Sequence, residues 1–142
     1  MLAMNFDAVL GDESISVVPD CDSLAAVGAF ADSLSAKLEI VPKIAKKINI
    51  VFDEIYANIV NYSKAPLANI SYRIENGKLI LTFSDNGIPY NPLKAAEPDT
   101  TLSAEEREIG GLGIFMVKKM TESMEYEYVD DKNILTLVIA LS

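Results

Sequence analysis

The segment KIAKKINIVFDEIYANIVNYS, from Lys43 to Ser63, carries the strongest information about the fold. Its apolar residues recur in steps of three and four, the spacing of one face of an α-helix. They are Ile44, Ile48, Val51, Ile55, Ile59 and Tyr62. Pro42 suits the first turn of such a helix, and the helix has to stop before Pro66. The sequence therefore predicts a helix from about Lys43 to Ser63 with an apolar stripe that faces a core.

Three polar side chains lie beside this stripe. At about 100° per residue, Glu54, Asn58 and Asn61 fall together on its edge, where polar groups need partners or a ligand. An amide oxygen of Asn58 could coordinate Mg²⁺, and Glu54 could accept a proton or hold a water beside a phosphate. The same spacing also fits an ordinary polar helix edge.

The remaining segments predict strands and two further helices around this helix. Strands are expected at Asn5–Leu10, Ser14–Val18, Asn69–Glu75, Lys78–Ser84, Glu125–Asp130 and Asn133–Leu141, and helices at Leu24–Leu38 and Gly113–Thr121. Asn76-Gly77 is a strong hairpin turn, and the last two strands are expected to turn at Asp131-Lys132. This order predicts one domain over residues 1–142: an α+β, two-layer sandwich with a mixed, mostly antiparallel sheet and helices on one face.

Two short motifs accompany the helix. Asp85-Asn86-Gly87 follows a predicted strand, where a buried carboxylate could accept a hydrogen bond from an exocyclic amine such as that of adenine. Gly110-Gly111-Leu112-Gly113 opens a predicted helix, whose first N–H groups can hold a phosphate oxygen. Alone, the first motif is also good turn chemistry and the second is also a flexible hinge.

Composition excludes several classes of function. The chain of 142 residues has a net charge of −9, which makes nucleic acid a poor partner. No apolar run approaches the roughly 20 residues that span a membrane, and no basic start of a signal peptide is present. With Cys21 as its only cysteine, the chain cannot form an internal disulfide, so we expect a cytoplasmic protein. It contains no histidine, which excludes histidine as base, ligand or phosphoacceptor.

The order of the three motifs resembles the ATP-binding superfamily of gyrase, heat-shock chaperones, histidine kinases and MutL (the Bergerat or GHKL fold). The resemblance covers about residues 40–141. Within that superfamily the chain looks like the stand-alone bacterial anti-sigma-factor serine/threonine kinases, whose boxes are matched by Asp53-Glu54…Asn58, Asp85-Asn86-Gly87 and Gly110–Gly113.

This resemblance implies ATP and Mg²⁺ as cofactors and a role for each matched residue. Asn58 would ligate Mg²⁺ and Glu54 would activate the protein serine. Asp85 would read the adenine amine, with Gly87 beneath the ring. The remaining candidates would bind nucleotide; they are Asn61, Arg107, Gly110, Gly111, Leu112 and Gly113. Residues 88–109 would form an ATP lid.

The implied function is an ATP-binding anti-sigma factor that phosphorylates a serine or threonine of an antagonist protein. Its partners would be a sigma factor and that antagonist, and it would form a homodimer. Many relatives carry a histidine where Tyr62 stands, which leaves Glu54 as the only obvious base. Two alternatives stay open: a non-catalytic, ATP-sensing partner-switch module, and an in-trans catalytic domain of a two-component system.

Overall fold

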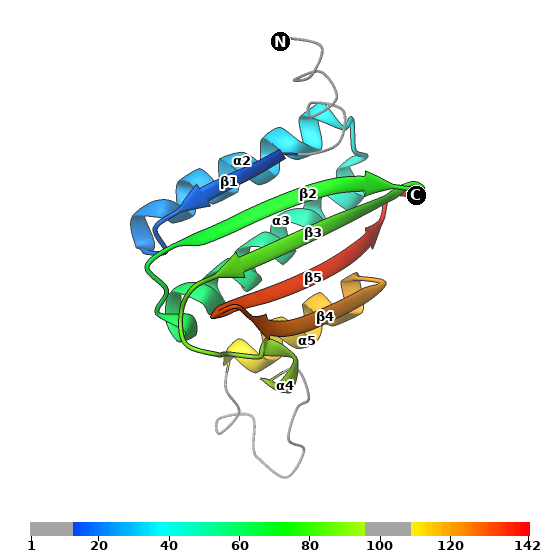
Figure 1. The fold of residues 1–142 in the computed structure, drawn as a ribbon. Helices are drawn as coiled ribbons and strands as arrows, with labels where there is room; N and C mark the ends of the chain where they lie inside the picture. The colour runs from blue at the N-terminus through cyan, green and yellow to red at the C-terminus, as the bar shows by residue number, and fades with distance from the viewer. Residues whose placement is uncertain (1–12, 96–108) are drawn as a thin grey trace.

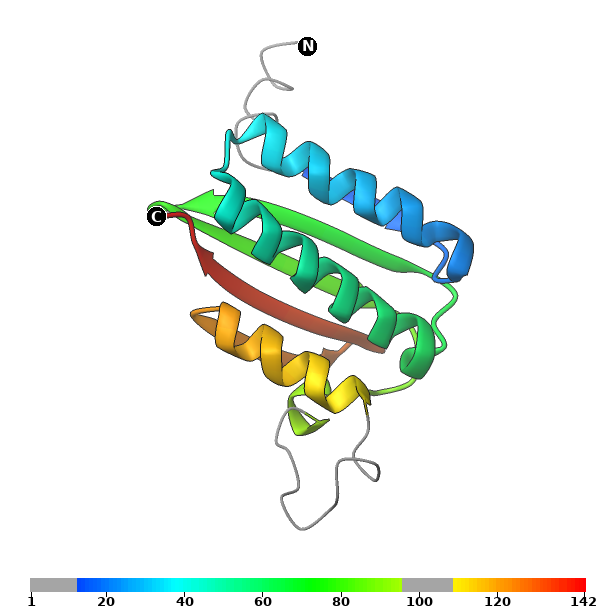
Figure 2. The same cartoon turned by 180° about the vertical axis from the view of Figure 1, so that it is seen from behind.

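A computed structural model describes residues 13–95 and 109–142. They form two layers, a five-stranded sheet with its long helices on one face (Figures 1 and 2). The strands are β1 (Glu13–Val17), β2 (Ala68–Glu75), β3 (Lys78–Asp85), β4 (Ser123–Val129) and β5 (Lys132–Ala140). The helices are η1 (Cys21–Ser23), α2 (Leu24–Lys37), α3 (Pro42–Asn58), η2 (Ile59–Ser63), α4 (Pro92–Ala95) and α5 (Ile109–Met120).

The strand order is β1-β2-β3-β5-β4, and all four neighbouring pairs are antiparallel. The predicted α+β sandwich is therefore confirmed, with an antiparallel sheet in place of the mixed sheet that we expected. The predicted strand at Asn5–Leu10 lies outside the described residues. Both hairpins turn on left-handed residues. Asn76 (φ 51°) and Gly77 (φ 76°) make the expected turn, while the second turn is Asp130-Asp131, one residue earlier than predicted.

Helix α3 lies in the centre of the helical layer. Ile48 and Val51 of α3 are completely buried, as the apolar stripe predicted, and Phe52 and Tyr56, which the stripe did not include, are also completely buried. The regular α-helix ends at Asn58, however, and the chain continues as one π-helical turn, η2. This wider turn leaves Asn61 exposed, so our expectation that Asn61 shares the core edge with Glu54 and Asn58 is wrong. π-helical turns are frequent at functional sites.

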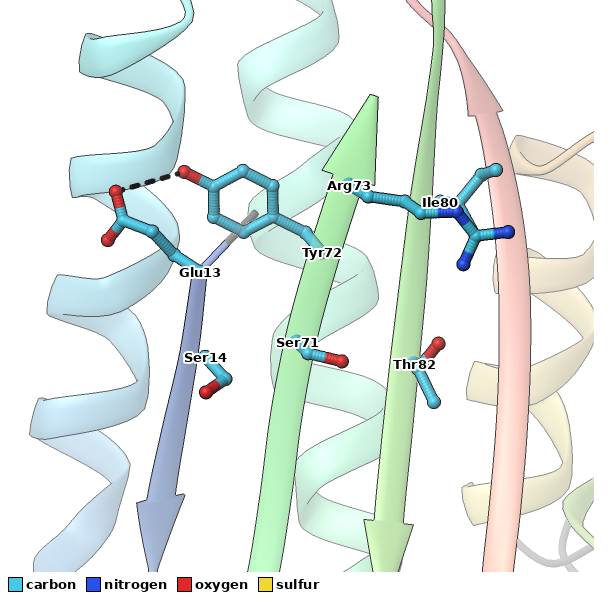
Figure 3. A pocket seen from close by; sticks show the side chains of 7 residues that line it. All are labelled: Glu13, Ser14, Ser71, Tyr72, Arg73, Ile80 and Thr82. Carbon is cyan, nitrogen blue, oxygen red and sulfur yellow. Dashed lines mark hydrogen bonds between the residues drawn. The ribbon is translucent and has the colours of Figure 1, made fainter. Parts of the chain in front are cut away.

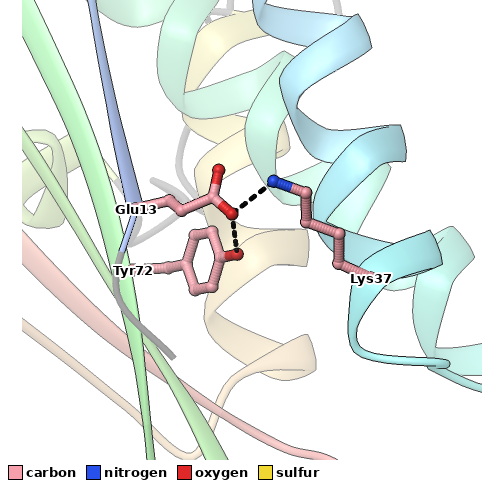
Figure 4. A network of polar contacts seen from close by, with 3 residues as sticks. All are labelled: Glu13, Lys37 and Tyr72. Carbon is pink, nitrogen blue, oxygen red and sulfur yellow. Dashed lines mark hydrogen bonds and ion pairs between the residues drawn. The ribbon is translucent and has the colours of Figure 1, made fainter. Parts of the chain in front are cut away.

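A network of polar contacts links the edge strand β1 to the helical layer. Glu13 Oε2 lies 2.5 Å from Lys37 Nζ of α2 and accepts a hydrogen bond of 3.3 Å from the Tyr72 hydroxyl of β2 (Figure 4). The ion pair is partly exposed to water, so it contributes at most about 1 kcal/mol. Its main effect is to fix β1 and α2 relative to each other.

The opposite face of the sheet carries no helix among the described residues, and it mixes hydroxyl-bearing with aliphatic side chains. A shallow hollow of about 330 Å³ lies on it, lined by small hydroxyl side chains and one cation (Figure 3). Ser14, Ser71 and Thr82 stand side by side on adjacent strands, and the guanidinium of Arg73 pairs with Glu75 at 2.7 Å. In the described part of the chain, no helix is long and apolar enough to cross a membrane.

Candidate functional site

The site lies where α3 and β3 end. Four polar side chains are buried in the described part of the chain, and all four line one cavity. They are Asn58, Ser63, Asp85 and Asn133. Each is at most 5% exposed, and the rest of the core is hydrophobic. Since buried polar groups are costly unless they have partners, their concentration around this cavity, which we call the polar cavity after these four side chains, makes it the candidate functional site.

Asp85, the last residue of β3, is held by three hydrogen bonds. Its Oδ1 accepts one from the Gly87 backbone N–H and one from Asn133 Nδ2, both at 2.9 Å. Its Oδ2 accepts a longer bond of 3.3 Å from the Ser63 hydroxyl. Because each carboxylate oxygen accepts about two hydrogen bonds, Oδ1 is saturated while Oδ2 retains acceptor capacity. Asp85 is thus positioned to accept a hydrogen bond from a ligand.

Asn133, the second residue of β5, is a site residue that sequence reasoning missed. Its Nδ2 also donates to the Ile88 carbonyl at 2.8 Å, while its Oδ1 accepts from the Tyr90 backbone N–H at 2.9 Å and from the Tyr126 hydroxyl. A backbone N–H can only donate and a backbone carbonyl can only accept, so these contacts fix the amide orientation. The signal was available, because Asn133 occupies an inward position on a strand whose other inward residues are aliphatic.

Tyr126 remains a hydrogen-bond donor in this network. Burial raises the pKa of its phenol, and the nearby Asp85 carboxylate adds to the rise, although a hydrogen bond with the Tyr90 backbone acts in the opposite direction. The phenol is therefore protonated at neutral pH and donates to Asn133.

Asn58 faces the same cavity from the last turn of α3. Its side-chain Nδ2 is buried and has no hydrogen-bond partner. The cavity itself measures only about 20 Å³, room for a single water molecule. Tyr90 and Pro92 also line it, and the Tyr90 ring stacks on Tyr62 with centroids 4.9 Å apart. A ring as large as a purine can enter only after the segment that bears Tyr90 and Pro92 has moved.

Glu54 lies one turn before Asn58, against the start of α5. A Cβ atom added to Gly113 would be 1.9 Å from Glu54 Oε2, so the carboxylate occupies the space that a larger residue at position 113 would fill. The structure thus brings Glu54 and the glycine box together, as the sequence suggested. Glu54 is half-buried, which agrees with its predicted place on the edge of the apolar stripe.

The glycine box itself differs from our expectation in one respect. α5 begins at Ile109, four residues before the predicted start, so Gly110, Gly111 and Leu112 lie in its first turn. The first four N–H groups of an α-helix have no partner within the helix, and Gly113 follows them. The free amides at this helix start therefore belong to residues 109–112. Arg107 and most of the predicted lid lie outside the described residues.

The packing around Gly87 gives a steric reason for glycine at this position, in addition to the predicted approach of a ring. A Cβ atom at this position would be 2.2 Å from the Ser63 carbonyl oxygen, a backbone atom that cannot turn aside.

We expect Gly87→Ala to lower the free energy of unfolding by about 1–3 kcal/mol, measured by urea denaturation. The matched control is Gly28→Ala in α2, where a Cβ meets nothing within 4 Å. Because alanine favours helix, this control should gain up to about 1 kcal/mol. Equal stability of the two variants would contradict the steric argument.

Asn133→Asp is expected to destabilise the protein by about 1–3 kcal/mol at pH 7, because an oxygen replaces the amide that donates to Asp85 and Ile88. The two neighbouring carboxylates raise one pKa in the folded state above its unfolded value. Lowering the pH below that raised pKa protonates the carboxyl group and removes the repulsion. The loss in free energy of unfolding relative to wild type should therefore become smaller. Urea denaturation at pH 7 and pH 5 measures both effects. Asn69→Asp on the open sheet face is the control, and a deficit independent of pH would argue against the carboxylate pair.

Comparisons with known proteins agree with this geometry. The family described as histidine kinase-like ATPase domain matches residues 17–139. A serine/threonine-protein kinase, BtrW, of Bordetella bronchiseptica is 26% identical over 113 residues, which cover 77% of this chain and 75% of that protein.

Two solved structures share the fold at low identity. The SiaB–SiaC complex from Pseudomonas aeruginosa matches with a TM-score of 0.60 and 14% identity, covering 97% of this chain and 96% of the matched chain. The Acinetobacter baumannii histidine kinase AdeS matches with a TM-score of 0.55 and 16% identity, covering 99% and 75%. Because the family match spans most of the sequence and ends in the strand behind the polar cavity, this chain belongs to the family of histidine kinase-like ATPase domains.

Proposed function

We propose that this chain binds ATP with Mg²⁺ in the polar cavity and transfers the terminal phosphate to a serine or threonine of an antagonist protein. In the same proposal it acts as an anti-sigma factor, so that phosphorylation switches its partners. The main support for the ATP site is that every buried polar side chain of the described residues lines one cavity, with Asp85 among them. The similarity to a serine/threonine-protein kinase supports the transfer step.

Asp85 is assigned to bind the base of the nucleotide. The free acceptor capacity of its Oδ2 suits the exocyclic amine of adenine, which guanine does not present at the same position. Movement of the segment with Tyr90 and Pro92 would open the cavity for the ring. Gly110, Gly111 and Leu112 supply the free amides of α5 for the phosphates, with Gly113 beside them. Arg107 and Asn61 keep the nucleotide-binding roles that the family resemblance implies.

The residues present fit a magnesium ion that is held largely by the nucleotide. Asn58 can supply one amide oxygen from the cavity wall. The described residues contain no cluster of three acidic, cysteine or histidine side chains that would hold a metal alone. Mg²⁺ commonly takes one or two protein ligands and completes its shell with phosphate oxygens and waters, which neutralises phosphate charge.

Glu54 is assigned as the general base. Its carboxylate would take the proton of the substrate hydroxyl as that oxygen attacks the terminal phosphorus, and the bond from this phosphorus to the bridging oxygen of ADP would break. ADP leaves as the second product. Phosphoryl transfer depends mainly on positioning and charge stabilisation, so this small set of groups suffices.

Tyr62 favours a second candidate function. It occupies the place of a histidine found in many relatives, and it stacks on Tyr90 at the mouth of the cavity. A chain with this substitution could sense ATP and hold a partner without transferring phosphate. An in-trans catalytic domain of a two-component system is a further alternative, in which the phosphoaccepting histidine would have to come from another protein.

The decisive experiment incubates the protein with γ-labelled ATP, Mg²⁺ and candidate antagonist proteins. We expect label on a serine or threonine of one antagonist. Nucleotide binding without transfer, equal in wild type and in Glu54→Gln, would favour the non-catalytic module. A protein that binds no adenine nucleotide would overturn both. Size-exclusion chromatography with light scattering tests the proposed homodimer, and fractionation of cells tests the cytoplasmic location.

A further inference from the structure

Five lysines gather at the end of the helical layer opposite the polar cavity. They are Lys43, Lys46 and Lys47 in the first turns of α3 and Lys118 and Lys119 in the last turn of α5. They represent five of the 12 cationic residues in a chain of net charge −9. α3 and α5 lie side by side and run in opposite directions, so their lysine-bearing ends meet (Figure 2). The axis of α3 spans about 22 Å between Lys43 and Asn58, which makes this cluster remote from the cavity.

A groove of about 370 Å³ lies between these helix ends and the end of β5. Three of the lysines line it: Lys43, Lys47 and Lys119. Ile44 and Ile139, both at least nine-tenths buried, give it an apolar floor. Glu122 is the one carboxylate side chain among its lining residues, and this group is already paired with Lys78 at 2.7 Å. Among the described residues, no carboxylate lies within ion-pair distance of the three lining lysines.

Helix stability does not explain the lysines of α3. The N-terminal end of a helix carries partial positive charge, so cations there are destabilising. The residue that precedes α3, Val41, offers no side-chain cap, and the first turn of α3 contains no acidic residue that would offset Lys43. Lys118 and Lys119, by contrast, are favourably placed at the C-terminal end of α5. Lys119 Nζ lies 4.8 Å from the centroid of the Phe115 ring, whereas Lys43 and Lys47 have no charged partner among the described residues. The groove therefore concentrates positive charge that no carboxylate pairs, which an anionic ligand would relieve.

We propose that this basic groove is a docking site for an acidic segment of a partner protein. The lysines are spread over two helices, which suits several carboxylates spaced along a chain better than one small anion. The apolar floor beneath them suits aliphatic side chains between those carboxylates. This apolar floor also favours a peptide with aliphatic side chains over the uniformly charged phosphate backbone of nucleic acid. The inference does not depend on the proposed phosphotransfer.

The test measures binding of a short fluorescein-labelled peptide, in which glutamate alternates with leucine, by fluorescence anisotropy at low and high salt. The groove variant is Lys43→Gln/Lys47→Gln/Lys119→Gln. The control, Lys64→Gln/Lys94→Gln/Lys132→Gln, removes the same number of charges elsewhere. We expect the groove variant to lose about tenfold in affinity, the sum of three modest ion pairs, and the control to stay close to wild type. Binding should weaken as salt rises.

Equal losses in the two triple variants would show a response to net charge alone and overturn the proposal. Tighter binding of single-stranded RNA than of the peptide, or competition by inorganic phosphate at the same affinity as the peptide, would also overturn it. Urea denaturation at low salt excludes misfolding as the cause of lost binding. Because the groove variant removes repulsion at the start of α3, it should be at least as stable as wild type.

Discussion

Replacing Asp85 with asparagine is expected to weaken ADP binding by about 100-fold, measured by isothermal titration calorimetry. The amide oxygen of the variant can still accept the two hydrogen bonds that now reach Oδ1, from Gly87 and Asn133. The new NH₂ group then takes the place of Oδ2, the oxygen with free acceptor capacity. An adenine amine would therefore face a donor instead of an acceptor. The Ser63 hydroxyl, which now donates to Oδ2, can accept a hydrogen bond from the new amide instead.

The control for Asp85→Asn is Ser84→Ala. Ser84 precedes Asp85 on β3, and alternation along the strand places it on the open face of the sheet. This variant should bind ADP like wild type. Nearly unchanged ADP affinity in Asp85→Asn would contradict the assignment of the base to Asp85.

Glu54→Gln is expected to lower the rate of phosphate transfer by about 100- to 10,000-fold, the usual contribution of a general base. Glutamine has nearly the shape of glutamate, so its contact with Gly113 is preserved and ADP affinity should change little. Single-turnover transfer from labelled ATP to an antagonist separates these two quantities.

Asp53→Asn is the matched control for Glu54→Gln. Asp53 is the adjacent residue of α3 and is exposed, so its replacement removes the same charge without touching the α5 contact. Both rates should be compared at saturating ATP. Transfer that continues at the wild-type rate in Glu54→Gln would remove Glu54 from the mechanism and leave the base unassigned.

Most of the fold could be predicted because its signals are local. Asn76-Gly77 fixes a hairpin through two positive φ angles, and the apolar stripe of α3 fixes which face is buried. The π-helical turn after Asn58 could not be predicted, because its residues have ordinary helical spacing and only tertiary packing widens the turn. Our prediction of the second hairpin turn was wrong by one residue, because neither Asp130 nor Asp131 is a glycine, the usual signal for left-handed backbone.

The site was predictable only in part. Asp85 and Asn58 stand in local motifs, and both prove to be buried in one cavity. Ser63 and Asn133 belong to no such motif. They reach Asp85 because the antiparallel pairing of β3 and β5 places Asn133 opposite Asp85, and because η2 returns beside the end of β3. These two contacts join residues 48 and 22 positions apart, and no periodicity within a single segment reveals them.

The side chain of Asn133 links two parts of the molecule by hydrogen bonds. Its amide holds the carboxylate of Asp85 and, with its remaining donor and acceptor, the backbone of Ile88 and Tyr90. A ligand that changes the position of Asp85 should therefore change the conformation of the loop that leaves β3. A protein that binds this loop should in turn change the affinity of the cavity for the ligand. Thermodynamic linkage requires the two effects to be equal in free energy. We therefore expect occupancy of the cavity and the conformation of the loop to be coupled through this amide.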